Sequence, residues 1–219
     1  MDATHTRLVA TVEGRYLSVA AHLARMSRYT ETIALRLGLD IERANLLRGA
    51  SKLHDIGKLA IPDRILLKPG PLTARERTII ERHAPIGHEL LSDSGSELLD
   101  VAAGIALSHH EHWDGSGYPR GLRADEIPLG ARIIAVVDAW DAMTTSRPYR
   151  SALAYEEATR RLADGAGTQW DPAMVHAFLQ VLAEDRSVGR SHTHASQPVS
   201  ESAAFDRTPR AADGTPVAA

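Results

Sequence analysis

Residues 131–145 have the sequence ARIIAVVDAWDAMTT, a very apolar helical pattern that is expected to be buried on most of its faces. Asp138 lies in the middle of this helix, where an unpaired carboxylate would cost several kcal/mol to bury. A bound metal ion is the simplest compensation, and a backbone amide or an arginine such as Arg132 is the structural alternative. Asp141, one helical turn later, is expected to support a ligand or to pair two helices. The stretch therefore predicts a central helix that carries a candidate metal ligand.

Helical periodicity also dominates on both sides of this stretch. Gly38 and Asp40 are expected to end one helix and cap the next, and residues 73–76 form a capping box. Pro85 with Gly87 marks a break or a new start. No convincing run of alternating strand residues is present, so the sequence predicts an all-α fold. Further helices are expected over residues of about 8–37 (one long helix or two joined ones), 40–55, 96–112, 155–164 and 171–184.

Two connectors rich in glycine and proline interrupt these patterns. They have the sequences IPDRILLKPGPL (residues 61–72) and DGSGYPRGLRADEIPLG (residues 114–130). From about Arg186 the composition changes to Ser, Thr, Ala and Pro with isolated charges, which is typical of disorder. The sequence predicts a single helical domain over residues 8–184 and a disordered tail over residues 185–219.

The composition excludes several classes of protein. With 43% hydrophobic and 24% charged residues, the 219-residue chain matches an ordinary soluble domain. The absence of cysteine excludes disulfides and thiolate metal sites and suits the cytoplasm, where the protein is expected. No apolar run approaches the roughly 20 residues that span a bilayer, and the N-terminus lacks a signal-peptide pattern. The net charge of −3 gives no indication of binding to polymeric nucleic acid.

The 11 histidines are the unusual feature of the composition, because several stand at expected helix ends. His54 and Asp55 are adjacent, so both side chains can reach one site only near the end of their helix. His109 and His110 are also adjacent and run into a glycine-rich loop, and His83 precedes a proline. Neutral imidazoles beside carboxylates suit first-row metal ions. Taken one at a time, these residues also fit exposed or core positions.

Five blocks of sequence together carry a family resemblance: HDIGKLAIPDRILLKPGPLT, ERHAPIG, SHHEHWDGSGYPRGL, ARIIAVVDAWDAMTTSRPYR and WDPAMVHAF. In their order and spacing they resemble HD-GYP domains, the members of the HD metal-dependent phosphohydrolase superfamily that hydrolyse cyclic di-GMP. The resemblance covers roughly residues 8–184. The His-Asp pair alone is a weak signal, but five blocks in register are specific. The implied fold is a single helical bundle of the HD superfamily with a long loop at residues 114–130, called the GYP loop below.

The resemblance implies a centre of two divalent metal ions. One ion would take His22, His54, Asp55 and Asp138, and the other would take Asp55, His83, His109 and His110. A mixed imidazole and carboxylate set suits iron or manganese better than tetrahedral zinc. Some family members carry a glutamate one turn before the first histidine that helps to hold a third metal. Ser18 stands there in this chain, so two ions are expected. The other histidines are expected on the surface, in the core or in the tail: His5, His88, His112, His176, His192 and His194.

The resemblance also implies residues that act on the substrate. Lys58 resembles a lysine of the family that stabilises phosphate charge, although by itself it also fits a solvated surface residue. Arg147 and Arg150 resemble residues that contact the phosphates. Tyr118 could contact a guanine or could merely pack in the loop. Two further residues are expected in a second layer that orients the ligands and the loop: Asp114 and Arg132.

The implied reaction is hydrolysis of one 3′–5′ diester of cyclic di-GMP to linear pGpG. Whether a second hydrolysis to GMP follows is left open. A hydroxide held between the metals would attack, with Asp55 and Lys58 as the catalytic residues. The implied binding partner is the small molecule cyclic di-GMP, and no membrane association is expected. The GYP loop is a candidate docking surface for a regulatory protein such as a diguanylate cyclase.

Three alternatives remain open. The chain could be an HD-superfamily hydrolase of another nucleotide or cyclic dinucleotide, a catalytically idle binding module, or a purely structural interaction domain. The GYP loop and the SRPYR block argue against the first, and the intact ligand positions argue against the second. Few residues precede the domain, so no fused sensor or receiver domain is expected.

Overall fold

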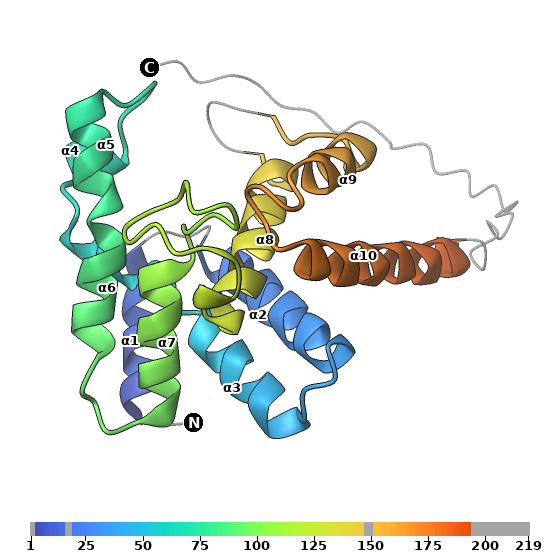
Figure 1. Cartoon of the computed structure of the whole chain (residues 1–219), viewed down its shortest axis with the longest axis horizontal. Coiled ribbons are helices and arrows are strands. Elements are labelled where there is room, and N and C mark those ends of the chain that lie inside the picture. The colour runs from blue at the N-terminus through green and yellow to red at the C-terminus, as the bar shows by residue number, and fades with distance from the viewer. Residues whose placement is uncertain (1–2, 16–18, 147–150, 194–219) are drawn as a thin grey trace, which may run out of the picture. The chain divides into compact units, whose positions relative to one another are not determined.

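The structure, a computed structural model, describes residues 3–15, 19–146 and 151–193, and these form helices joined by turns (Figure 1). No strand occurs in these ranges; an isolated bridge joins Ala166 to Trp170 within one turn. The all-α prediction is confirmed. Within the same ranges, no helix is long and apolar enough to cross a membrane. In chain order the elements are α1 Ala3–Arg15, α2 Val19–Arg36, α3 Ile41–Ser51, the 3₁₀ helix η1 Ile56–Ala60, α4 Asp63–Leu66, α5 Ala74–Glu81, α6 His83–Leu91, α7 Glu97–Ser108, the 3₁₀ helix η2 Ala124–Glu126, α8 Leu129–Thr144, α9 Tyr155–Asp164 and α10 Pro172–Thr193.

Helix α8 is the central helix of the bundle, as its apolar sequence predicts. It packs against α2, α3, α7 and α9. Ile133, Ile134 and Val137 are fully buried, whereas the Asp138 side chain keeps 28% of its surface exposed. Asp138 therefore lies at the edge of the core, on the face of α8 that the apolar residues leave open.

Aromatic contacts join α10 to this bundle. The Phe178 ring on α10 meets Tyr29 of α2 edge-on at 5.1 Å between centroids and Trp140 of α8 at 5.9 Å. Helix α10 continues to Thr193, past the end expected near residue 184. The rest of the predicted tail, residues 194–219, lies outside the described residues, so its disorder stays a prediction from composition.

The predicted caps are present. Gly38 has a φ of 84°, the left-handed conformation that ends a helix. The Asp40 side chain accepts a hydrogen bond from the Arg43 amide at 2.7 Å. Thr73 and Glu76 form the reciprocal capping box at the start of α5. These short-range signals set where α3 and α5 begin.

Two helices end earlier than predicted, and both changes concern candidate ligands. Helix α3 ends at Ser51, and the chain turns through residues 52–55 before η1 begins. His54 and Asp55 therefore lie on a turn rather than on the helix itself. Helix α7 ends at Ser108 instead of continuing to about residue 112, so His109 and His110 follow its last turn. Turn residues can point back across a helix end, which is the direction the site requires.

Gly57 lets two segments of backbone approach each other closely. It lies inside η1, which packs against α6. A Cβ atom at Gly57 would lie 2.0 Å from the carbonyl oxygen of His83 and 2.6 Å from the amide nitrogen of Gly87. The absence of a side chain thus lets the backbones of η1 and α6 touch. This contact brings the turn that carries Asp55 against the start of the helix that carries His83.

Replacing Gly57 by alanine tests this contact. We expect Gly57→Ala to lower the free energy of unfolding by about 1–3 kcal/mol, because the added methyl group must push two backbones apart. Urea denaturation followed by circular dichroism measures the change. Gly104→Ala in α7 is the matched control, since its Cβ would meet no atom within 4 Å. That control should gain about 0.5–1 kcal/mol from helix propensity, and equal effects of the two substitutions would contradict the role of Gly57.

Candidate metal centre

Seven side chains from segments far apart in the sequence form two groups of potential metal ligands. They come from α2, the turn after α3, the start of α6, the end of α7 and the middle of α8. Within each group, one ligand atom per residue lies within 4.8 Å of all the others. The first group consists of His22, His54 and Asp138, and the second of Asp55, His83, His109 and His110.

The Asp55 carboxylate lies between the two groups. Its Oδ2 atom is 3.3 Å from Nε2 of His54, which belongs to the first group. Its Oδ1 atom is 3.4 Å from Nε2 of His83 and 3.7 Å from Nε2 of His109. The two oxygens of one carboxylate therefore face histidines of both groups, which is the geometry of a carboxylate that two cations share.

Hydrogen bonds on the far side of three rings select the nitrogen that faces this centre. In His54, His83 and His109 the Nδ1–H group donates to the carbonyl three residues earlier, at 2.9, 2.6 and 3.0 Å. A carbonyl only accepts, so Nδ1 carries the proton and Nε2 keeps its lone pair for a cation. The three carbonyls belong to the last turns of α3, α5 and α7, where helical partners run out.

The ring of His22 is held by a carboxylate instead of a carbonyl. Its Nδ1 atom lies 2.7 Å from Oδ2 of Asp141, and its Nε2 atom lies 3.8 Å from Oδ1 of Asp138. Arg25 also donates to Asp141, with Nε at 2.5 Å from Oδ1. Burial acts against the ionised form, but the hydrogen bonds from His22 and Arg25 lower the pKa of Asp141 to about 2. Asp141 therefore both orients a histidine and joins α8 to α2.

Two buried atoms of the centre have no hydrogen-bond partner among the described residues. They are Nε2 of His54 and Oδ1 of Asp55. Buried polar atoms are nearly always paired, and an unpaired one costs free energy. A cation in each ligand group would satisfy these atoms, since Nε2 of His54 faces the first group and Oδ1 of Asp55 faces His83 and His109 of the second. The donor set therefore fits a metal ion.

The electrostatic environment sets protonation states that suit metal binding at Asp55, His83 and His110, whereas the pKa of His54 shifts the other way. Burial lowers the pKa of His83 to about 4 and also lowers the pKa of His110. Burial acts against the ionised form of Asp55 as well, but Lys58 and His54 hold its pKa well below the ordinary value. For His54, burial opposes the charged form, and the Asp55 carboxylate outweighs it and raises the pKa. At neutral pH Asp55 is thus ionised and His83 and His110 are neutral, the forms that ligate metals.

Glu111, which none of the sequence motifs indicates as a functional residue, organises the GYP loop. Its side chain is buried, with the residue only 2% exposed. Oε1 accepts from the Arg120 amide at 2.8 Å, and Oε2 accepts from the Leu122 amide at 3.1 Å. The available signal was a carboxylate placed directly before a long loop whose amides have no ladder to join.

Tyr118 packs against a candidate ligand. Its ring stacks on His110 with 4.8 Å between centroids and an interplanar angle of 22°, and its amide donates to the His110 carbonyl at 3.2 Å. Gly117 permits this approach, because a Cβ there would lie 2.2 Å from the His112 amide nitrogen. Burial raises the pKa of the Tyr118 hydroxyl. The packing alternative for Tyr118 is therefore the one that the geometry favours.

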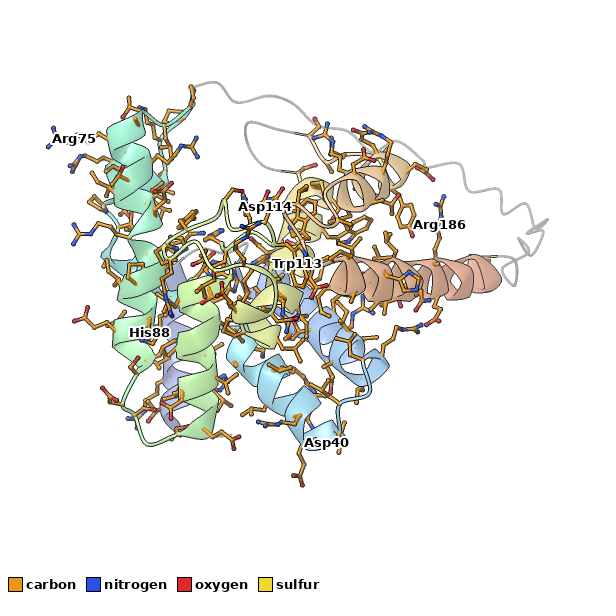
Figure 2. The ribbon with its side chains drawn as sticks, in the orientation of Figure 1. Asp40, Arg75, His88, Trp113, Asp114 and Arg186 are labelled. Carbon is orange, nitrogen blue, oxygen red and sulfur yellow. The ribbon has the colours of Figure 1, made fainter. Side chains whose placement is uncertain are left out.

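The other residues expected to act near the centre lie in its surroundings or outside the described ranges. Asp114 is exposed and accepts from the Ser116 amide at 2.9 Å; Figure 2 shows it beside Trp113 near the start of α10. Arg132 pairs with Asp125 at 2.8 Å and with Asp171 at 2.9 Å, rather than with Asp138. Both residues therefore hold the GYP loop and its neighbours, and no ligand contact is found for either in the described part of the chain. Three positions lie outside the described residues: Ser18, Arg147 and Arg150.

Comparison with known proteins gives consistent matches. The family model described as "HD domain" matches residues 9–174. The cyclic di-GMP phosphodiesterase response regulator RpfG of Xanthomonas campestris pv. campestris is 43% identical over 196 residues, which cover 89% of this chain and 52% of RpfG. The 3′3′-cGAMP-specific phosphodiesterase 2 of Vibrio cholerae is 41% identical over 173 residues, covering 79% of this chain and 33% of the relative. This chain thus spans about half the length of RpfG and about a third of the length of the Vibrio cholerae relative.

A solved structure agrees in fold. Bd1817, an HDG"Y"P protein from Bdellovibrio bacteriovorus, matches with a TM-score of 0.60 and 21% identity, over 75% of this chain and 52% of that chain. At this identity the likeness concerns the helical arrangement. It supports the bundle described above independently of the sequence matches.

Removing the charge behind His22 tests the outer hydrogen bonds. We expect Asp141→Asn to weaken binding of Mn²⁺ about 10- to 100-fold, because the ring loses the partner that fixes its tautomer and orientation. Isothermal titration calorimetry on metal-stripped protein measures the dissociation constant. Asp164→Asn is the matched control, since that side chain is 62% exposed and pairs with Arg160 at the surface of α9. Unchanged Mn²⁺ affinity in Asp141→Asn would show that the pair does not serve the centre.

Hydrogen exchange tests the role of Glu111. Glutamine offers a single carbonyl oxygen and a donor in place of the second acceptor, so Glu111→Gln must leave a loop amide unpaired. We expect the Arg120 and Leu122 amides to exchange about 10- to 100-fold faster, because a hydrogen bond to a charged acceptor contributes about that factor. Glu126→Gln is the control, because Glu126 accepts from the neighbouring Arg123 amide at 2.9 Å. If only the control accelerated exchange in the loop, Glu111 would have no organising role.

Proposed function

This chain belongs to the HD domain family, in its HD-GYP branch, and on that basis we propose that it is a metal-dependent phosphodiesterase that hydrolyses cyclic di-GMP to linear pGpG. The observation that carries the proposal is the convergence of imidazole and carboxylate ligands in two groups that meet at Asp55. A hydrolase of phosphodiesters needs positive charge where the phosphate binds, and these ligands can hold metal cations that supply this charge.

The proposed centre holds two divalent ions, iron or manganese. His22, His54 and Asp138 would hold one ion, His83, His109 and His110 would hold the other, and Asp55 would contribute to both. Imidazole and carboxylate donors without thiolate support these metals over zinc in a tetrahedral site. When bound, such ions lower the pKa of a water molecule and neutralise charge on the phosphate.

Lys58 is proposed to bind a phosphate oxygen of the substrate. Its ammonium lies 2.5 Å from Oδ2 of Asp55, and its side chain is 36% exposed, so it stands at the open edge of the centre. Attack of a water oxygen on phosphorus places charge on the non-bridging phosphate oxygens, which a positioned cation stabilises, and cleavage of the bond to O3′ leaves its electron pair on O3′. Arg147 and Arg150 are proposed to contact the phosphates, since the forked guanidinium suits such contacts.

A second candidate substrate is another cyclic dinucleotide. The relative from Vibrio cholerae that is 41% identical to this chain is named as specific for 3′3′-cGAMP. Cyclic di-GMP and 3′3′-cGAMP share the 3′–5′ diester on which the centre would act. Residues that contact the bases, rather than the metal ligands, must therefore decide between them. A catalytically idle binding module is less well supported, because every expected ligand position carries a histidine or an aspartate.

The wider setting of the protein is also a proposal. The catalytic domain is proposed to comprise residues 8–184, which the compact unit over residues 1–184 supports. A cytoplasmic location is supported by the absence of cysteine. The GYP loop is proposed as a surface for a regulatory partner such as a diguanylate cyclase, because it lies against the centre.

The double substitution His54→Ala with Asp55→Ala tests the proposed activity. We expect turnover of cyclic di-GMP to fall below detection, because both groups lose a ligand, while helical circular dichroism stays near that of the wild type. Liquid chromatography of the pGpG product, with metal analysis of anaerobically purified protein, measures the effect. His176→Ala with Asp164→Ala removes the same residue types from exposed positions and should retain turnover. Loss of helicity in the first variant would mean that the pair is structural, and retained turnover would refute the proposed centre.

A further inference from the structure

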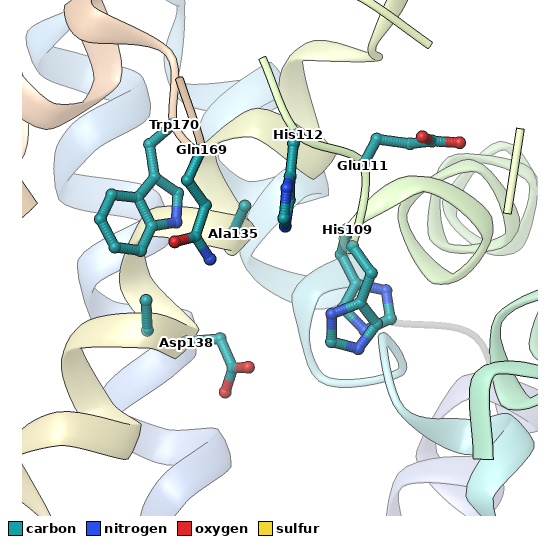
Figure 3. Close-up of a pocket in the computed structure, with 9 residues that line it drawn as sticks. His109, Glu111, His112, Ala135, Asp138, Gln169 and Trp170 are labelled. Carbon is teal, nitrogen blue, oxygen red and sulfur yellow. The ribbon is translucent and has the colours of Figure 1, made fainter. Parts of the chain in front are cut away.

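A pocket of about 180 Å³ opens beside the metal centre (Figure 3). His109, His110 and Asp138 form the side that belongs to the centre. The opposite side comes from the turn between α9 and α10, where Gln169 and Trp170 face the histidines. Figure 3 shows the Gln169 amide extending into the space above Asp138. The pocket thus adjoins the proposed phosphate position, and its wall at Gln169 and Trp170 lies outside the ligand set.

The turn that carries Gln169 is held by backbone hydrogen bonds on two sides. The backbone N–H of Gln169 donates to the Gly165 carbonyl at 3.0 Å, and the backbone carbonyl of Gln169 accepts from the Trp113 backbone N–H at 3.2 Å. One residue earlier, the Thr168 carbonyl accepts from the Asp114 amide at 2.9 Å. The position of Gln169 is therefore set relative to the segment that follows the histidine doublet. Such fixed placement is what a binding residue requires.

Trp170 gives the pocket a fixed apolar wall. The residue is only 8% exposed, and a Cβ on Gly165 would lie 2.4 Å from its six-membered ring. Ala135 and Ala139 on α8 also line the pocket and present only methyl groups. Small side chains at these positions leave the space that a larger residue would fill.

We propose that this pocket binds one purine base of the cyclic dinucleotide and that the Gln169 amide contacts the edge of that base. The inference rests on the proposed function and names the part of the site that recognises the base. A pocket of about 180 Å³ is below the roughly 300–1,000 Å³ of sites that enclose a whole drug-sized ligand, so it suits one part of the molecule. The adjacent phosphate would lie over the metal ligands.

The chemistry of the pocket favours a neutral base over a phosphate. No lysine or arginine is among the described residues that line it. The Gln169 amide offers both a donor and an acceptor, and its side chain has no hydrogen-bond partner in the described part of the chain. A purine edge presents a complementary acceptor and donor side by side, such as O6 and N1–H of guanine. The primary amide can therefore pair with that edge through two hydrogen bonds.

Two substrates distinguish base recognition from the reaction at phosphorus. Cyclic di-GMP carries the bases, and bis(p-nitrophenyl) phosphate is a diester without them. We expect Gln169→Ala to lower the ratio of kcat/KM for cyclic di-GMP to kcat/KM for bis(p-nitrophenyl) phosphate about 3- to 10-fold. This factor corresponds to the loss of one neutral hydrogen bond. The loss should appear in KM rather than in kcat. Binding of GMP, followed by tryptophan fluorescence, should weaken by a similar factor.

Ala135→Leu provides an independent variant, because it fills the pocket and leaves every polar group in place. It should lower the same ratio. Gln180→Ala on the exposed face of α10 is the matched control and should keep the wild-type ratio. Thermal unfolding by circular dichroism identifies any variant that fails to fold.

The outcomes separate the two proposals. If both pocket variants kept the wild-type ratio while the wild type hydrolysed cyclic di-GMP, the base pocket would be wrong and the proposed function would stand. An equal loss on both substrates would assign Gln169 to the metal centre and overturn the inference. If the wild type hydrolysed the simple diester but no cyclic dinucleotide, the proposed function would fail and the pocket assignment with it.

Discussion

The structure depends on a carboxylate that is surrounded by imidazoles. Asp55 has histidines on both oxygens, and one of those oxygens is buried without a hydrogen bond. An ionised group in this position needs positive charge close by, and Lys58 supplies only part of it from the open edge. The fold brings five segments together at this one point. A cation in the centre would stabilise their meeting, so folding and metal binding are expected to be linked.

The ends of the helices explain how so many ligands can meet without a dedicated loop for each. The last carbonyls of a helix lack some of their usual helical partners, and three histidines each donate an Nδ1–H group to one of these carbonyls. The same bond turns Nε2 toward the centre. The negative ends of α3, α5 and α7 thereby lie near the place where cations would bind, which is the favourable sign. Capping and ligand orientation are here one and the same interaction.

The segment after the histidine doublet links the centre to the substrate side. Glu111 ties the GYP loop through two backbone amides, and Tyr118 returns to stack on His110. The amides of Trp113 and Asp114 hold the turn before α10. A shift of this segment would therefore move a ligand and the wall of the pocket together. A regulatory partner that bound the GYP loop would act on both.

The amino-acid order alone is enough to derive the helical class, the caps at Asp40 and Thr73 and the central place of α8, because these follow from local hydrogen bonding and from the spacing of apolar residues. Family motifs also indicate which histidines and aspartates belong together. The folded chain was needed for the contact at Gly57, the bonds of Glu111 and the position of Gln169. Each of these depends on how closely segments far apart in sequence approach one another, and such distances are set by packing in three dimensions rather than by neighbouring residues.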